Sequence, residues 1–167
     1  MAAGELYRDF GMDAIADDPP PSEEDLTVFQ HNGRAWVATD SDDIPIAYIL
    51  VETVDGWAHI EQVSVHPCHS RNGLGRALID HAELWADGCG LGGMTMTTFR
   101  DVPWNAPYYE RLGFVPVPEP AWSEGLRRIV SQEGLHGLNA WPRVVMMKPG
   151  KRQHRIASNK ITARPRR

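Results

Sequence analysis

Hydrophobic and polar residues alternate along three segments in the first half of the chain, residues 34–39, 46–54 and 57–65. A period of two is typical of β-strands with one buried face. Asp55 and Gly56 stand between the second and third segments, and Asp-Gly is a strong signal for a two-residue hairpin turn. We therefore expect strands 46–54 and 57–65 to form an antiparallel hairpin.

The pattern changes to a helical period directly after this hairpin. One apolar stripe is predicted on a helix that ends near Gly88, from the spacing of Leu74, Ala77, Leu78, Ala82 and Trp85. Weaker patterns predict helices at 5–16, 23–30, 106–112 and 123–133, and strands at 94–99, 114–117 and 141–147. Because a helix joins strand 57–65 to strand 94–99, we expect those strands to be parallel neighbours. The predicted fold class is α+β: a mixed, mostly antiparallel central sheet with one parallel pair, flanked by helices.

Length and composition fit one folded domain over residues 1–150. The chain has 167 residues, 42% hydrophobic and 23% charged, as expected for a globular protein with a sizeable core. No apolar run is long enough for a membrane helix, and the acidic start lacks an apolar signal segment. Cys68 and Cys89 are too few for a disulfide framework. We therefore expect a cytoplasmic protein that does not act at a membrane.

Charge is divided unevenly along the chain. Residues 151–167 carry seven Lys or Arg and no acidic residue, so the net charge of −5 leaves −12 on residues 1–150. The basic tail lacks apolar periodicity, and we expect it to be mobile and solvated. The acidic body disfavours nucleic acid as a specific ligand and favours a cationic one.

A turn rich in glycine and arginine opens helix 74–88, with the sequence Ser70-Arg71-Asn72-Gly73-Leu74-Gly75-Arg76. The unpaired N–H groups and positive dipole end of a helix N-terminus suit an anion such as a pyrophosphate. The chain lacks the full dinucleotide fingerprint and the Gly-Lys-Ser/Thr of a P-loop, which excludes those two nucleotide sites. Taken alone, the turn is equally compatible with a plain glycine turn.

A second motif narrows this choice. VHPCHSRNGLGRAL follows the hairpin, and Tyr109, Gly113 and Phe114 complete Tyr-x-x-x-Gly-Phe some thirty residues later. Over roughly residues 34–148 these motifs resemble the GNAT superfamily of N-acetyltransferases. The resemblance implies the GNAT-like acyl-CoA acyltransferase fold, with the parallel strand pair at the cofactor site, and acetyl-CoA as the co-substrate. Ser70 stands where the family usually has Gln or Arg. The family's first strand is also missing, so either the sheet begins one strand short or the true start lies upstream.

The resemblance implies how acetyl-CoA is held. In the family, backbone N–H groups of the turn bind the pyrophosphate, and backbone groups of the preceding strand bind the pantetheine arm like an added strand. Arg71 and Arg76 supply positive charge in place of the missing Gln or Arg. The implied cofactor-binding residues are Val63, Ser64 and Val65 on the strand, Ser70, Arg71, Asn72, Gly73, Leu74, Gly75 and Arg76 at the turn, and Asn105 before helix 106–112.

The resemblance also implies a base and an acid. An ammonium acceptor must lose a proton before it attacks, and the family places the base at the position of His59 or Glu61, which the strand period predicts on one face. Glu61 is the first choice because a carboxylate also attracts a cationic amine; His59 has the more suitable intrinsic pKa. Tyr109 matches the family's general acid. The structural alternatives are a solvated strand face for His59 and Glu61, and packing on the cofactor for Tyr109.

The sequence thus predicts an N-acetyltransferase that transfers the acetyl group of acetyl-CoA to a primary amine of a small molecule. Two alternatives stay open: a non-catalytic module that binds acyl-CoA, and an acetyltransferase for protein or peptide N-termini. His66, Cys68 and His69 lack a second cluster to complete a metal site, so we expect no metal. The resemblance is also compatible with a homodimer.

Overall fold

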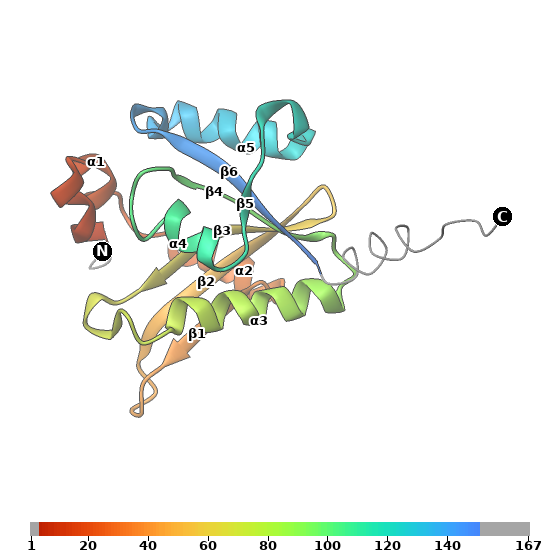
Figure 1. Ribbon diagram of the computed structural model, residues 1–167. Coiled ribbons are helices and arrows are strands. Elements are labelled where there is room, and N and C mark those ends of the chain that lie inside the picture. Colours follow the sequence, from red (N-terminus) through yellow and green to blue (C-terminus); the bar gives the residue numbers. More distant parts are fainter. Residues whose placement is uncertain (1–3, 151–167) are drawn as a thin grey trace. The chain divides into compact units, whose positions relative to one another are not determined.

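Residues 4–150 are described by the structure, a computed structural model, and their elements follow the predicted order (Figure 1). The strands are β1 (Ala35–Thr39), β2 (Pro45–Val54), β3 (Trp57–Val65), β4 (Gly93–Phe99), β5 (Val115–Pro116) and β6 (Arg143–Pro149). The helices are α1 (Asp13–Ala16), α2 (Glu23–His31), α3 (Leu74–Gly88), α4 (Ala106–Arg111) and α5 (Glu124–Leu135). Turns of 3-10 helix are η1 (Gly4–Phe10), η2 (Pro67–His69), η3 (Glu119–Ala121) and η4 (Leu138–Ala140).

The strands of residues 4–150 form one six-stranded sheet in the order β1-β2-β3-β4-β6-β5. β1 pairs antiparallel with β2, and β6 pairs antiparallel with both β4 and β5. α3 connects β3 to its neighbour β4, and such a crossover connection makes these two strands the parallel pair. The predicted mixed sheet is therefore confirmed. Within the described residues no strand precedes β1.

Two compact units divide the described residues. Unit 1 contains residues 4–52 and 60–81, and unit 2 contains residues 53–59 and 82–150. The chain crosses from one unit to the other within β2, β3 and α3.

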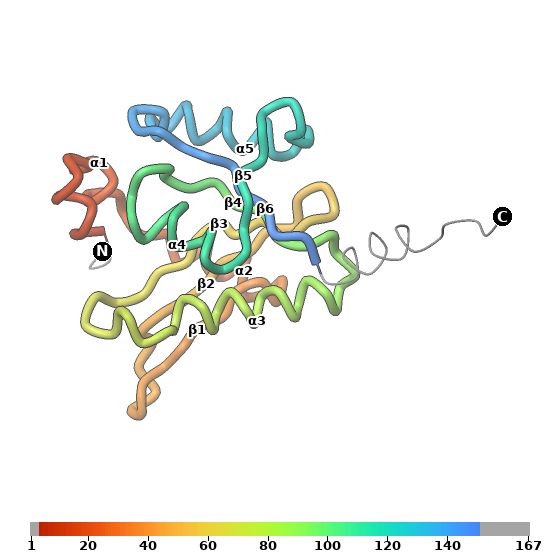
Figure 2. The backbone as a smooth tube through the Cα atoms, viewed as in Figure 1, coloured from red at the N-terminus to blue at the C-terminus, as the bar shows by residue number. Residues whose placement is uncertain are grey.

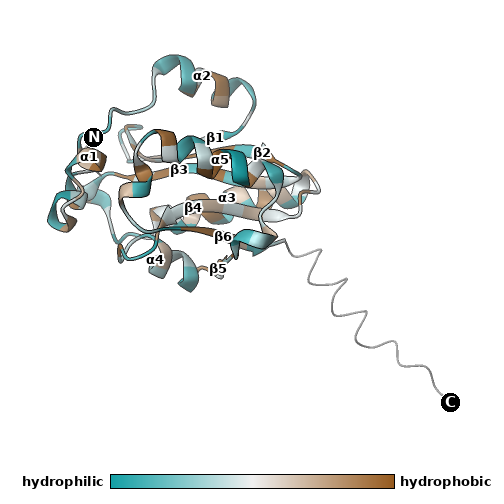
Figure 3. Ribbon diagram, turned by 90° about the horizontal axis from the view of Figure 1, so that it is seen from above, coloured by the Kyte–Doolittle hydropathy of each residue, from teal (hydrophilic) through white to brown (hydrophobic). Residues whose placement is uncertain are grey.

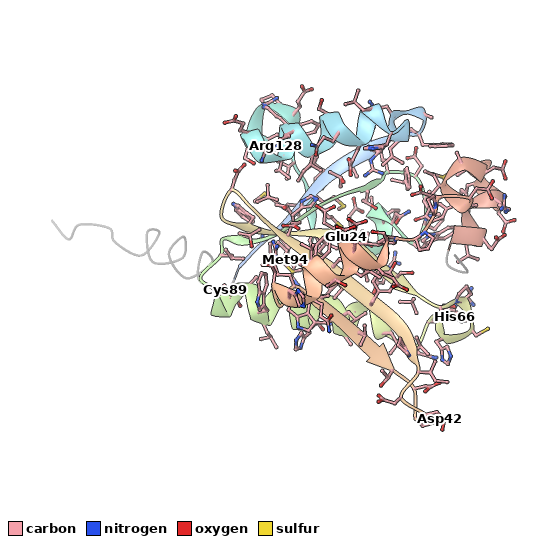
Figure 4. All side chains as sticks on the ribbon, turned by 180° about the vertical axis from the view of Figure 1, so that it is seen from behind. Glu24, Asp42, His66, Cys89, Met94 and Arg128 are labelled. Carbon is pink, nitrogen blue, oxygen red and sulfur yellow. The ribbon has the colours of Figure 1, made fainter. Side chains whose placement is uncertain are left out.

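Unit 1 is built on the pairing of β1 with β2. The register runs from Ala35 opposite Leu50 to Ala38 opposite Ala47, with an irregularity at Thr39. The loop between the two strands is easily followed in Figure 2, and Figure 4 labels Asp42 at its tip. Trp36 packs edge-on against His81 of α3, with ring centroids 5.4 Å apart.

The N-terminal segment of unit 1 corrects one prediction. A single helix is expected over residues 5–16, but η1 and α1 are separated at Gly11, whose φ is +66°, and Met12 is buried. Arg8 joins the two pieces by ion pairs to Glu5, Asp13 and Asp17. The apolar period alone does not detect this break, because both pieces keep helical spacing.

The helix α2 begins with a capping box, in which Ser22 accepts from the N–H of Asp25 and the Asp25 side chain accepts from the N–H of Ser22. None of its residues is buried, and Figure 3 shows hydrophilic and hydrophobic residues mixed along it.

Burial along α3 differs in phase from the predicted stripe. Ala77 is exposed, whereas Ile79, which the stripe omits, is fully buried. Leu78, Ala82 and Ala86 are buried as well. The helix thus presents a face centred between Leu78 and Ile79, about a quarter of a turn from the predicted one.

Unit 2 is held by the pairing of β4 with β6, from Gly93 opposite Pro149 to Phe99 opposite Arg143. Met94, Met96 and Met146 from these strands are buried. Lys148 of β6 forms an ion pair with the buried Glu83 of α3, at 2.7 Å. Because both side chains are largely removed from water, truncating either would leave the other buried and unpaired.

The hairpin turn between β2 and β3 also caps α5. Asp55 and Gly56 have φ of +48° and +80°, as a two-residue hairpin turn of this type requires. The Asp55 carboxylate accepts the N–H of Gly125 at 2.7 Å, and the hydroxyl of the N-cap Ser123 accepts the N–H of Leu126. Hydrogen bonds from Ser123 and Gly125 lower the pKa of Asp55.

Gly125 is required by this close approach. A Cβ added at Gly125 would lie 2.5 Å from Cγ1 of Val54 and 2.6 Å from a carboxylate oxygen of Asp55. Any larger residue would push α5 away from the turn that caps it.

None of the helices within residues 4–150 is both long and apolar enough to cross a membrane. The basic tail of residues 151–167 lies outside the described residues. The single domain over residues 1–150 stays a prediction.

We predict that Gly125→Ala lowers the free energy of unfolding by about 1–3 kcal/mol, because the new methyl group overlaps Val54 and Asp55. Urea denaturation followed by circular dichroism measures this. Gly88→Ala in α3 is the matched control: its Cβ would meet open space, so stability should stay equal or rise slightly. Equal effects of the two variants would contradict the close approach.

Candidate active site

The loop between β3 and α3 is fixed by its own side chains. His66 caps η2 by accepting the N–H of Cys68 at 3.3 Å, and its ring lies 5.9 Å from the ring of His69. The Ser70 hydroxyl donates to the carbonyl of Pro67 at 2.8 Å. Ser70, at the position where a longer polar residue is usual, therefore closes the turn through its side chain.

Backbone geometry at residues 71–73 suits an anion. Arg71 has a φ of +65° and Gly73 a φ of +76°, while Asn72 between them does not have a positive φ. Alternation of this kind turns successive N–H groups toward one concavity, which is how backbone nests bind phosphates. A positive φ costs a non-glycine residue about 1 kcal/mol, so the strain at Arg71 marks a conformation that the surrounding chain imposes.

The first turn of α3 adds to this anion site. α3 has 15 residues, and its N-terminal N–H groups and dipole follow Gly73 directly. Arg71 is exposed, and within the part of the chain that the structure describes Arg76 makes an exposed pair with Asp80 at 3.6 Å. A surface pair of this kind contributes little, so Arg76 can turn toward an anion at little cost. The residues present therefore fit a pyrophosphate.

The unit 1 part of β3 carries the remaining strand residues. Val63, Ser64 and Val65 are half-buried, and Glu61 is exposed. Ser64 hydrogen-bonds the Tyr48 hydroxyl; burial nevertheless raises the pKa of that phenol. An amine from solvent can reach Glu61 because its side chain is exposed.

His59, in unit 2, has a different environment from Glu61. Only 1% of its surface is exposed, and Nδ1 lies 3.0 Å from the hydroxyl oxygen of Thr95 on β4. Burial, with a smaller effect from the positive charge of Arg143, lowers the pKa of His59 to about 4. The imidazole is therefore neutral near pH 7, and it accepts a proton only weakly.

α4 positions the last two predicted site residues within unit 2. Asn105 precedes the helix and is 6% exposed, and its side chain does not cap the helix. Tyr109 is 7% exposed, and its ring packs against Phe114 and Tyr108 at 6.0 and 5.4 Å. The backbone N–H of Phe114 donates to the carbonyl of Tyr109, which closes the Gly-Phe end of the motif. Packing of Tyr109 on aromatic neighbours is therefore observed.

Comparison with known proteins identifies the fold and the family. A model of the acetyltransferase (GNAT) family matches residues 3–114. The chain belongs to this family. The predicted family is thereby confirmed, and with it acyltransferase chemistry at the level of the family.

Solved structures agree with this GNAT assignment. A protein described as a streptothricin acetyltransferase, from Bacillus anthracis str. Ames, was solved with acetyl coenzyme A; it is 22% identical, with a TM-score of 0.51 over 68% of this chain and 58% of that one. The ribosomal-protein-S18-alanine N-acetyltransferase of Escherichia coli is 21% identical, with a TM-score of 0.54 over 80% and 79%. A GNAT acetyltransferase of Staphylococcus aureus Mu50 is 12% identical, with a TM-score of 0.65 over 87% and 86%. The chain spans less than two thirds of the first of these proteins, and at such identities the likeness shows the fold.

Three residues around His59 and Ser64 escaped the sequence prediction. Thr95 and Arg143 define the environment of His59, and Tyr48 is the partner of Ser64. The predicted strand 94–99 implies that Thr95 and Thr97 share one face, but no local signal indicates which residues they contact. Among residues 4–150, no group of three or more His, Cys, Asp or Glu side chains is arranged to hold a metal ion.

We predict that the His59 imidazole titrates near pH 4 in the folded protein, measured by NMR. Between pH 6.5 and about 4 the unfolded chain binds a proton at His59 that the folded chain does not bind. Titration of His59 therefore leaves the free energy of unfolding unchanged above pH 6.5. As the pH falls from 6.5 to about 4, the free energy of unfolding decreases by about 3 kcal/mol.

The control for this prediction is His59→Asn, which keeps a polar atom near the Nδ1 position and does not titrate. The difference in stability between the two proteins should follow the pH window above. A titration midpoint near 6.5 would contradict the buried, neutral state.

Proposed function

We propose that this GNAT protein is an acetyl-CoA-dependent N-acetyltransferase that acts on a primary amine of a small molecule. The observation that carries the proposal is the alternating backbone of Arg71 and Gly73 at the N-terminus of α3, within the stretch that the family model matches. When bound, acetyl-CoA supplies a thioester that is attacked by the amine and a thiolate that leaves. The chain's own residues bind the cofactor and move two protons.

Binding is assigned to two segments of unit 1. N–H groups of residues 71–76 and the charges of Arg71 and Arg76 hold the phosphates, with Asn72, Leu74 and Gly75 contributing backbone groups. Backbone groups of Val63, Ser64 and Val65 hold the pantetheine arm in the manner of an added strand. Ser70 contributes to cofactor binding by closing the turn, because its hydroxyl already donates a hydrogen bond to the carbonyl of Pro67. Asn105, in unit 2, is a further cofactor contact in this proposal.

Glu61 is the proposed base, in preference to His59. An exposed carboxylate attracts an ammonium group and takes its proton directly or through one water. A buried imidazole with a lowered pKa is a poorer acceptor, and its Nδ1 already lies within hydrogen-bond distance of Thr95. The protein environment thus reverses the order that the intrinsic pKa values suggest.

Tyr109 is the proposed acid that protonates the leaving thiolate. A phenol has a pKa near 10, so it is protonated at neutral pH and can give its proton to the thiolate as the C–S bond breaks. The packing of Tyr109 between Tyr108 and Phe114 fixes the direction of its ring. The backbone of the Tyr-x-x-x-Gly-Phe motif therefore sets where the proton is delivered.

The acceptor class is an inference from charge rather than from the relatives. The relatives' names include a streptothricin and a ribosomal-protein acetyltransferase, so they do not decide between small molecules and proteins. The −12 charge of residues 1–150 favours a compact cationic amine.

Cys68 and Cys89 are free and exposed, which fits the reducing cytoplasm. Cytoplasmic location and a homodimer stay predictions.

We predict that Tyr109→Phe lowers kcat by about a hundredfold or more, because the leaving thiolate loses its proton donor. Acetyl-CoA affinity should change far less, since the ring is kept. Release of free thiol from acetyl-CoA measures the rate with a panel of primary amines, and calorimetry measures the affinity.

The matched control is Tyr108→Phe, which removes a hydroxyl one position away on the same helix and should leave kcat within a few-fold. An unchanged kcat for Tyr109→Phe would refute the acid assignment. Thermal stabilisation of the wild type by acetyl-CoA, without thiol release for any amine, would favour the non-catalytic binding module.

A further inference from the structure

An open groove of about 460 Å³ lies in unit 2, between α5, η4 and the start of β6. Its size falls within the range of roughly 300–1,000 Å³ typical of small-molecule sites. Polar side chains and two indoles line it, namely Thr97, Trp122, Glu133, Asn139, Trp141 and Arg143. Apart from Thr97, these residues lie beyond residue 114, where the match to the family model ends. The groove is therefore built mainly by a part of the chain that the family model does not describe.

An ion pair forms the polar part of this groove. Oε1 of Glu133 accepts a hydrogen bond from Nη2 of Arg143 at 2.7 Å and another from the hydroxyl of Thr97. Nη2 of Arg143 also lies 2.9 Å from that hydroxyl oxygen. The second carboxylate oxygen of Glu133, Oε2, is buried and has no hydrogen-bond partner. One half of the carboxylate is thus fully engaged, and the other half lacks a donor.

A buried carboxylate oxygen without a donor is costly, because it has lost water and gained nothing in return. A ligand that brings an N–H donor to Oε2 would remove this cost. An ammonium or guanidinium group does so best, because a charge-assisted hydrogen bond is the strongest available. The charge of Arg143 opposes a second cation, but Arg143 is held on Oε1 and on the ring of Phe99, 4.8 Å away.

The two indoles of the groove are held in place before any ligand binds. Nε1 of Trp122 donates to the carbonyl of Val117 at 2.8 Å, and Trp141 packs edge-on against Phe99 at 6.3 Å. Fixed aromatic faces beside a carboxylate are the usual surroundings of a bound organic cation. The two indoles and the unpaired Oε2 of Glu133 therefore both favour an organic cation as the ligand.

The groove adjoins the surroundings of His59 within unit 2. Thr97 lies two residues after Thr95 on β4, so both side chains point to one face, and Thr95 contacts His59. Two residues along a strand span about 7 Å. Arg143, which belongs to the groove, also acts on His59. A ligand that contacts Thr97 in the groove is thus about one strand repeat from the contact of Thr95 with His59.

We propose that this groove binds a second, non-reacting cationic nitrogen of the acceptor, so that diamines and guanidino amines are the preferred substrates. The inference rests on the proposed N-acetyltransferase function and names its substrate class. Glu133 and Arg143 are binding residues in this account and take no part in proton transfer.

The test compares matched amines on the full chain. Putrescine and agmatine carry a second cationic group that butylamine lacks, and thiol release from acetyl-CoA gives kcat/KM for each. We expect the dications to exceed butylamine by on the order of tenfold to a hundredfold. Glu133→Gln, which keeps an acceptor for Arg143, should abolish this preference, so that the ratio of kcat/KM for a dication to kcat/KM for butylamine falls to about one. A preference that survives in Glu133→Gln, or that is absent in the wild type, overturns the proposal.

Two further arms keep the test decisive. Glu119→Gln is the control, because this exposed carboxylate of unit 2 pairs only loosely with Arg127 at 3.8 Å and does not line the groove. If Glu133→Gln fails to fold, the exposed Asn139 allows a charge test at low salt: Asn139→Asp should raise the dication preference and Asn139→Lys should lower it. Equal effects of the two charges would contradict the proposal.

Failure of the proposed function is recognised separately. If no amine is acetylated by the wild type, calorimetry with putrescine tests the groove without turnover. Binding that is lost in Glu133→Gln supports the cation site although the transferase function fails. No binding to the wild type overturns the site as well.

Discussion

The carboxylate of Asp55 links the hairpin to the helix on which the proposed acceptor site depends. The turn at Asp55 and Gly56 reverses the chain into β3, and the same Asp55 caps the first turn of α5. α5 in turn carries Glu133, which holds Arg143 of β6, and Arg143 acts on His59 of β3. A change at the turn therefore reaches the surroundings of His59 through contacts within one unit. Gly125 is part of this constraint, since only a residue without a side chain leaves room for the carboxylate.

The two units divide the chemistry in a way that follows from their local structure. Unit 1 contains the strained backbone of Arg71 and Gly73, the exposed N-terminus of α3 and the exposed Glu61, which are features of anion binding and proton exchange with solvent. Unit 2 contains a buried imidazole, a half-buried ion pair and fixed aromatic rings, which are features of a preformed pocket. The positive φ of the exposed Arg71 has no stabilising role of its own, and strain of this kind is common at functional sites. In the proposed function, cofactor binding therefore depends on backbone geometry, and acceptor selection depends on a preformed pocket.

Much of the fold could be predicted because local patterns were strong. The alternation along β2 and β3, Asp-Gly at the turn and the helical spacing after Gly73 located the hairpin and the crossover helix correctly. The apolar pattern failed to predict features that depend on tertiary contacts. Ile79 rather than Ala77 is buried on α3, the first helix breaks at Gly11, and β6 begins at Arg143 rather than at the predicted residue 141. For the candidate site, strand alternation predicted that His59 and Glu61 lie on the same face of the strand. It could not predict that His59 is buried and Glu61 is exposed. The contact of Glu133 with Thr97, 36 residues apart, has no sequence signal.

The proposed function requires that an acetyl group moves directly from acetyl-CoA to an amine. The most direct measurement uses acetyl-CoA with a deuterium-labelled acetyl group and putrescine, followed by mass spectrometry of both the small molecules and the protein. We expect labelled N-acetylputrescine in equal amount to free coenzyme A, with no label on the protein. Labelled acetate without the amide, or label retained on Cys68 or Cys89, would contradict it.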